Sequence, residues 1–78
     1  MRVIVDIQTG IGGVITRVYE YSQEKMRELI ENDFNWAINH NMLENEDEVQ
    51  EILDESEIYS ADIIMSDRGI HYEVCEVE

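Results

Sequence analysis

The spacing of apolar residues changes along this chain from alternation to helical spacing and back, and this change constrains the fold more than any other feature. Val3, Val5 and Ile7 alternate with polar residues, which predicts a half-buried strand over residues 2–8. Residues 14–21 are rich in β-branched and aromatic side chains, which favour a second strand. The start of the chain is therefore expected to form a β-hairpin with the segment TGIGG as its loop.

The middle of the chain predicts two helices. Ser22 is the expected N-cap of the first, because its hydroxyl can accept a hydrogen bond from a free backbone N–H. The Asn-containing run at residues 39–41 is expected to end this helix. Its apolar stripe comprises Met26, Leu29, Ile30, Phe34, Ala37 and Ile38. A shorter helix is expected after Asn45, which would cap it while Glu48 completes a capping box. Its candidate core residues are Val49, Ile52 and Leu53.

The last third of the chain alternates again, in two segments joined by the sequence SDRG. The residues that share a core-facing side are Tyr59, Ala61, Ile63 and Met65 in the first segment, and Tyr72 and Val74 in the second. Gly69 is expected to supply a positive φ in the loop. The order ββααββ predicts an α+β fold, with an antiparallel four-stranded sheet and two helices packed on one face. Residues 1–78 are expected to form a single domain.

The glycine-rich loop at residues 9–13 is similar over a few positions to a dinucleotide-binding fingerprint. Three glycines follow a strand within four positions, but Gln8 stands where the first glycine of such a motif belongs. The strand-like segment 14–21 stands where a helix should hold the phosphate. The loop is therefore interpreted as a hairpin turn, and no cofactor is expected.

Two pairs of titratable side chains are candidates for a small reactive or metal-binding site. Asp33 and His40 project from nearly the same face of the first helix, without an accompanying nucleophile or oxyanion element. Asp33 is expected to cap a backbone group or to mark where the apolar stripe meets solvent. His71 and Cys75 share a strand face, but two ligands do not close a metal site. A surface histidine and a small buried thiol are expected, and no catalytic or metal-binding residue is assigned.

Acidity is the most unusual property of the composition. Nineteen acidic residues oppose five basic ones, for a formal net charge of −14, whereas a magnitude of roughly 2 to 8 suffices for solubility. Repulsion disfavours direct binding to nucleic acid or to an anionic membrane and favours a basic protein partner. The lone Cys75 and a short N-terminal apolar stretch interrupted by Asp6 indicate a reducing compartment, without signal peptide or membrane span. The cytoplasm is expected.

Residues 44–57, ENEDEVQEILDESE, concentrate this charge, with eight acids and no base. On a helix with a rise of about 1.5 Å per residue they would span roughly 21 Å, or one charge per ~2.6 Å, against one per ~1.7 Å of duplex DNA. Glu48, Glu51 and Glu55 are expected to form an outward stripe, because apolar positions take the inner face. The predicted partner-binding residues are Glu44, Glu46, Asp47, Glu48, Glu51, Asp54, Glu55 and Glu57.

In size, acidity and absence of a catalytic motif, the chain resembles small phage-encoded inhibitors, the anti-CRISPR and anti-restriction proteins that place carboxylates where a nuclease expects phosphates. The resemblance is one of type across the whole chain, and no functional residue is carried over from it. It implies a non-enzymatic inhibitor that occupies a basic nucleic-acid-binding surface of a nuclease or CRISPR effector in the host cytoplasm.

Other interpretations stay open. The chain could be an acidic intracellular adaptor or antitoxin-like binding module, whose acidic helix docks on a basic protein that is not a nucleic-acid enzyme. It could also be a halophilic small domain, in which acidity serves hydration alone. An acidic run is often only a solvated helix face, but such faces ordinarily intersperse lysine or arginine. A small enzyme using Asp33 and His40 is the remaining alternative.

Overall fold

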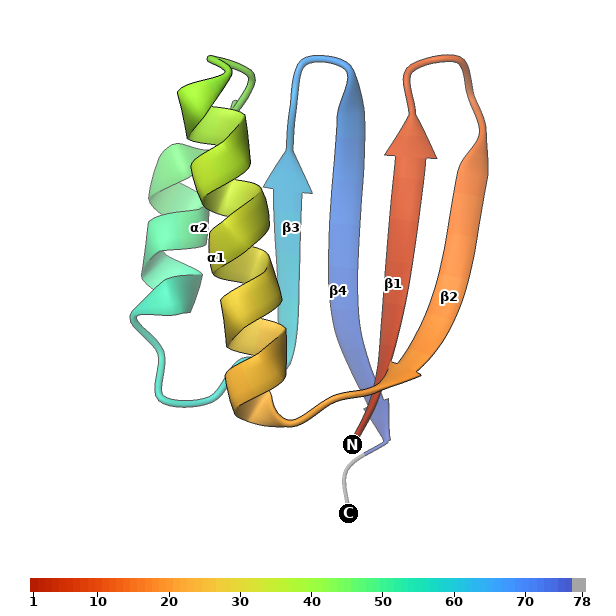
Figure 1. Cartoon of the computed structure of the whole chain (residues 1–78), viewed down its shortest axis with the longest axis vertical. Helices are drawn as coiled ribbons and strands as arrows, with labels where there is room; N and C mark the ends of the chain where they lie inside the picture. Colours follow the sequence, from red (N-terminus) through yellow and green to blue (C-terminus); the bar gives the residue numbers. More distant parts are fainter. Residues whose placement is uncertain (77–78) are drawn as a thin grey trace.

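The computed structural model describes residues 1–76 and contains one four-stranded antiparallel sheet with two helices (Figure 1). The elements are β1 (Arg2–Thr9), β2 (Val14–Glu20), α1 (Gln23–Asn39), α2 (Glu46–Leu53), β3 (Ser60–Ile64) and β4 (Arg68–Glu76). The strand order across the sheet is β2-β1-β4-β3. The predicted α+β class and ββααββ order are confirmed.

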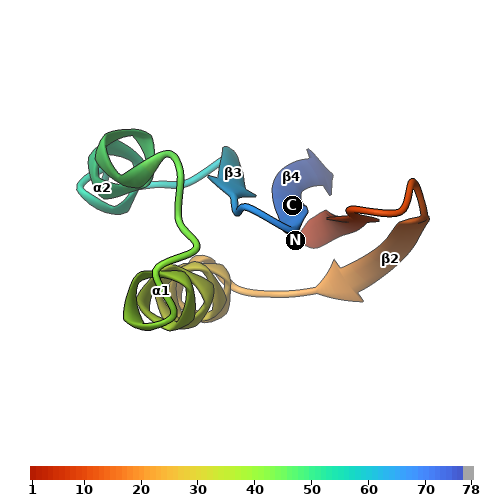
Figure 2. The same cartoon turned by 90° about the horizontal axis from the view of Figure 1, so that it is seen from above.

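Both helices gather at the β3 end of the sheet. α1 packs against α2, and each of them contacts β3. Seen from above, β2 lies at the opposite end, with no helix over it (Figure 2). The molecule is a slab of 36 × 28 × 15 Å, so one end of the sheet is covered and the other is bare. Neither of the helices in the described part of the chain is long and apolar enough to cross a membrane.

A single core joins the helices to the inner face of the sheet. Val3 and Val5 are buried, as the alternation of β1 predicts. The buried core residues are Val3, Val5, Met26, Ile30, Phe34, Ala37, Val49, Ile58, Ala61, Ile63, Met65 and Tyr72. Leu29 and Ile38 of the predicted α1 stripe are half-buried and pack at the margin of this core. The helical spacing therefore identified the correct face of α1.

The ends of α1 also agree with the sequence. The Ser22 hydroxyl accepts a hydrogen bond from the Lys25 N–H at 3.1 Å, which makes Ser22 the N-cap. The helix ends at Asn39, and Asn41 has a φ of 55°. Asparagine tolerates this left-handed conformation better than most residues, so the predicted helix end is confirmed.

The start of β3 differs from the prediction. Tyr59 is 55% exposed, and its hydroxyl donates to the Glu57 carboxylate. β3 begins only at Ser60, so the in–out alternation does not extend back to Tyr59. Its neighbour Ile58 is fully buried instead. The Gln23 amide binds both the N–H and the C=O of Ile58 at 2.8 Å, and this pairing holds the entering chain against the core.

The two hairpin loops use their glycines differently. Gly69 lies inside β4 and has no positive φ, so that prediction is wrong. The β3–β4 turn is closed instead by a hydrogen bond from the Met65 N–H to the Arg68 carbonyl. In the β1–β2 loop, Gly12 does have a positive φ of 87°, and the Thr9 N–H donates to a carbonyl across the turn. The interpretation of TGIGG as a hairpin turn is confirmed.

Candidate functional site

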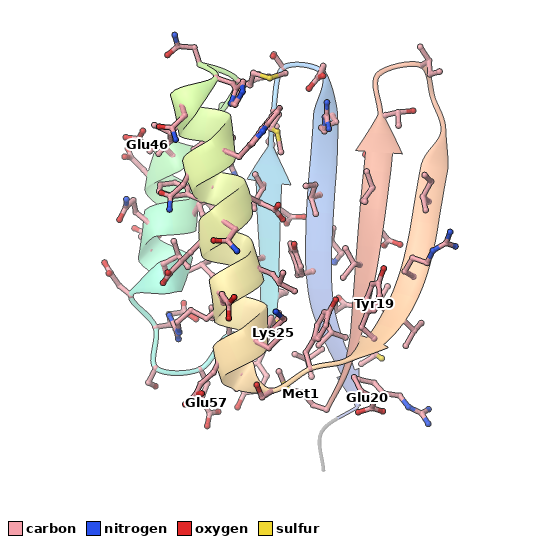
Figure 3. The ribbon with its side chains drawn as sticks, in the orientation of Figure 1. Met1, Tyr19, Glu20, Lys25, Glu46 and Glu57 are labelled. Atoms are coloured by element: carbon pink, nitrogen blue, oxygen red, sulfur yellow. The ribbon has the colours of Figure 1, made fainter. Side chains whose placement is uncertain are left out.

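The acidic segment, residues 44–57, lies along the α2 end of the molecule. All eight of its carboxylate side chains are exposed. Figure 3 labels Glu46, at the start of α2, and Glu57, at the end of the segment, on the side of the slab away from Tyr19 of β2. The expectation that most of these side chains point outward is confirmed.

The segment is not one continuous helix. α2 covers only Glu46–Leu53, Asp54 is its C-cap, and Glu55 follows it. The stripe predicted through Glu48, Glu51 and Glu55 is therefore wrong as a helical stripe, because the chain turns back towards β3 after Leu53. The eight residues of α2 rise roughly 12 Å and carry four acids, or one per ~3 Å, close to the ~3.4 Å between phosphates of one DNA strand.

Asn45 holds the first turn of α2, but not as predicted. Its side chain makes no capping hydrogen bond to the helix. Instead its Nδ2 donates to the Asp62 carbonyl at 2.8 Å, and its Oδ1 accepts the Ile64 N–H at 3.0 Å. The Glu44 N–H also donates to the Ile64 carbonyl at 2.8 Å. The side-chain amide thus satisfies outward-facing peptide groups of β3 and ties the start of α2 to the sheet.

Arg27 of α1 holds the other end of α2. Its guanidinium donates to the Leu53 and Glu55 carbonyls, each at 2.5 Å. α2 has no basic residue in its last turn, so Arg27 supplies the cation that the negative end of the helix dipole favours. The spacing of residues within α1 does not predict this role of Arg27, and the only signal for it in the sequence is the absence of a basic residue from the last turn of α2.

Among the described residues, the carboxylates of the acidic segment have no basic side chain as a direct partner, since Arg27 binds backbone carbonyls of the segment. Within residues 1–76, no salt bridge joins a basic side chain to any of the eight carboxylates. The ion pairs of the basic side chains lie elsewhere: Arg2 with Glu20, Lys25 with Glu28, and Arg68 with Asp67. The eight carboxylates therefore present a negative surface without a salt bridge in the described part of the chain, on a segment held at both ends.

The distribution of acids along α2 does not follow helix stability. Glu46, Asp47 and Glu48 lie in the first turn, where carboxylates interact favourably with the helix dipole. Glu51 and Asp54 lie near the other end, where the same dipole disfavours them. The dipole of α2 alone therefore disfavours the carboxylates at this end, where the Arg27 guanidinium is the nearby cation.

Asp33 and His40 lie in different environments. The Tyr72 hydroxyl donates to the Asp33 carboxylate, so Asp33 binds a side chain and not a backbone group. Its half-buried position agrees with the other expectation, that Asp33 marks where the apolar stripe meets solvent. Burial raises the pKa of Asp33, and the hydrogen bond from Tyr72 partly opposes that rise. Burial likewise raises the pKa of Tyr72. His40 is exposed and stacks on Trp36 with ring centroids 4.1 Å apart.

Side chains alternate along β4, and Tyr72 and Val74 face the core. His71 and Cys75 therefore point to the opposite face of the sheet. His71 Nδ1 lies 2.6 Å from a carboxylate oxygen of Asp62. Cys75 is exposed, so the prediction of a buried thiol is wrong. Among the described residues there is no group of three or more side chains placed to hold a metal ion.

Comparison with known proteins adds no relative. The chain matches no protein-family model, no curated protein and no solved structure. The acidic segment is therefore interpreted from its own geometry and charge.

Proposed function

We propose that this protein is a non-enzymatic inhibitor that binds the basic nucleic-acid-binding surface of a nuclease or a CRISPR effector. The acidic segment would occupy this basic surface as a mimic of a phosphate backbone. Its partner-binding residues would be the eight carboxylates of residues 44–57.

The observation that carries the proposal is a dense and exposed set of carboxylates that form no salt bridge with any described residue, on a segment held at both ends. The mean number of acids per unit length of α2 is close to that of phosphates on one nucleic-acid strand. Lysine and arginine side chains that bind phosphates can form charge-assisted hydrogen bonds with carboxylates at such a density.

The anchoring of α2 supports the same conclusion. Asn45 ties its start to β3, and Arg27 binds the carbonyls at its end. A segment already ordered before binding loses less conformational entropy when it docks. The carboxylates at the C-terminal end of α2, which the helix dipole disfavours, are explained if their role lies outside the fold.

The test measures inhibition of a candidate nuclease or CRISPR effector by the purified chain. Binding should weaken steeply as salt increases, and the nucleic acid of the partner should compete for the same surface. The variant Glu51→Gln/Asp54→Asn removes two charges and should raise the inhibition constant. The expected loss is about 1 to 3 kcal/mol for each desolvated contact, or a few tenths for each contact at a solvated rim.

A matched control is Glu31→Gln/Glu73→Gln, which removes the same charge from exposed positions outside the segment. This control should inhibit as well as the parent chain. Equal losses in both variants would indicate a general effect of net charge. Binding that nucleic acid leaves unchanged would refute mimicry and favour the adaptor interpretation, and unfolding at low salt would favour the halophilic one.

A further inference from the structure

The β2 end of the sheet exposes apolar side chains on both faces. Every residue of β2 is exposed. Of the eight large apolar side chains exposed in the described part of the chain, five lie on β2 or on the loop before it. They are Ile11, Val14, Ile15, Val18 and Tyr19. A patch of this kind on a sheet edge is typical of a site of association.

The backbone of β2 is also unpaired on its outer side. The Tyr21 N–H donates to the Met1 carbonyl, and the Thr9 N–H donates to the Gly13 carbonyl. In this register the peptide groups of the odd-numbered residues of β2 point towards β1. The N–H and C=O groups of the even-numbered residues of β2 therefore point outwards. Within residues 1–76, no hydrogen bond outside the sheet reaches these groups. At the opposite edge, Asn45 binds the Asp62 C=O and the Ile64 N–H, and the Glu44 N–H binds the Ile64 C=O.

The charge distribution makes this edge the part of the molecule best suited to meet another copy. Residues 7–19 contain no acid and one base, Arg17. The acidic α2 lies at the other end of the 28 Å dimension of the slab (Figure 1). That separation exceeds the screening length of about 8 Å at physiological ionic strength. Two copies that meet edge to edge therefore keep their acidic segments far apart.

We propose that β2 pairs antiparallel with β2 of a second copy, about a two-fold axis at Thr16. Val14 then lies opposite Val18 of the second copy, and the two Thr16 residues face each other. Both pairs lie on the outer face of the sheet, and the outward peptide groups of both strands bond to one another. A register centred on Arg17 is less favourable, because it sets two arginines opposite each other.

The remaining contacts fit the same register. Gly13 lies opposite Tyr19 of the second copy, a pairing in which an aromatic ring can cover a glycine. The strand pair forms a continuous eight-stranded sheet with one acidic helix at each far end. An interface of this size is small, so the dimer is reversible and depends on concentration. Added salt should strengthen it, because each copy carries a net charge of −14.

Sedimentation equilibrium of the full chain up to millimolar concentration tests the proposal. The expected result for the parent chain is a monomer–dimer equilibrium. Val14→Lys/Val18→Lys sets lysine opposite lysine in both flanking pairs and should weaken the dimer by about tenfold or more. Val14→Lys/Val18→Glu sets each introduced lysine opposite the introduced glutamate of the second copy in this register alone and should retain the dimer. Val14→Thr/Val18→Thr is the uncharged β-branched control.

Both valines are exposed, so the monomer should tolerate these substitutions, and circular dichroism checks that each variant is folded. The proposal is overturned if the parent chain is monomeric throughout, since a different occupant would then be needed for the edge. It is also overturned if the double-lysine variant dimerises like the parent. Loss of the dimer in both the lysine–lysine and the lysine–glutamate variants would refute the register at Thr16.

Discussion

The two edge strands of the sheet, β3 and β2, differ in how much of their surface and backbone is covered. Two helices pack against β3, and Asn45 binds two of its outward peptide groups. β2 has no helix over it, and its residues are exposed on both faces. The acids follow the same division, since the α2 end carries the acidic segment and residues 7–19 carry no acid.

The difference teaches where the stability of this fold resides. Ten of the twelve core residues come from the two helices, β3, β4 and the turns beside them, and the other two, Val3 and Val5, come from β1. β2 contributes none of them. The end that carries the core also carries the densest charge, so its packing must offset charges that oppose the dipole of α2. The β2 end has no such cluster of acids, and its exposed edge is the one proposed to bind another copy.

The largest expected effect separates the two ends by their packing. Phe34 lies in the core and is 5% exposed. Phe34→Ala should lower the free energy of unfolding by about 3 to 5 kcal/mol. Val18→Ala on β2 should cost less than about 1 kcal/mol, because Val18 is 59% exposed. Urea unfolding of monomeric protein measures both. Similar losses would mean that β2 belongs to the cooperative core after all.

The next effect concerns protection of the edges. Asn45→Ala leaves two peptide groups of β3 without their side-chain partner and should cost about 1 to 3 kcal/mol. Thr16→Val removes the hydrogen bond from the Thr16 hydroxyl to Asp6 on the exposed outer face and should cost less. Amide exchange at Ile64 should accelerate in the Asn45 variant only. An unchanged rate there would show that Asn45 does not protect this edge.

A third comparison uses two tyrosines on the same face of the sheet. Tyr72→Phe removes the hydroxyl that donates to the half-buried Asp33, and should cost about 1 to 2 kcal/mol. Tyr19→Phe at the bare end should have a smaller effect, because Tyr19 is 40% exposed. Thermal unfolding of the two variants measures the difference. Equal losses would contradict a stabilising contact between β4 and α1.

Asp33 gives the same contact a pH dependence. Burial raises its pKa in the folded state, so its contribution to stability is complete below the ordinary aspartate pKa of about 3.9 and is lost as pH rises through the folded value. Asp33→Asn should therefore be more stable than the parent at neutral pH, with an advantage that shrinks on acidification. An advantage that grows on acidification would contradict the raised pKa.

Much of the fold could be predicted because local patterns and tertiary packing agree. The stripe of α1, its Ser22 cap and the alternation of β1 each correspond to a buried face or a satisfied backbone group. The errors occur where distant partners decide. Asparagine is a common N-cap, but the side-chain amide of Asn45 binds the β3 edge instead. Gly69 needs no positive φ, because a hydrogen bond between Met65 and Arg68 closes the turn.

The acidic segment shows the same division. Its composition and exposure could be predicted from eight acids around a few apolar positions. Its shape could not, because α2 ends at Leu53, where Arg27 from another helix binds the terminal carbonyls. Spacing within one segment gives no information on a side chain that arrives from 26 residues away.

The central claim is that the carboxylates at the C-terminal end of α2 bind a partner and lower the stability of the helix. The smallest of the expected stability effects tests this claim most directly. The measurement is the free energy of unfolding of Glu51→Gln/Asp54→Asn beside Glu46→Gln/Asp47→Asn. Both variants remove two charges from one helix. We expect the first to be more stable than the parent and the second less stable, by about 0.5 to 1 kcal/mol each. If the first variant is destabilised instead, these carboxylates support the fold and the claim is contradicted.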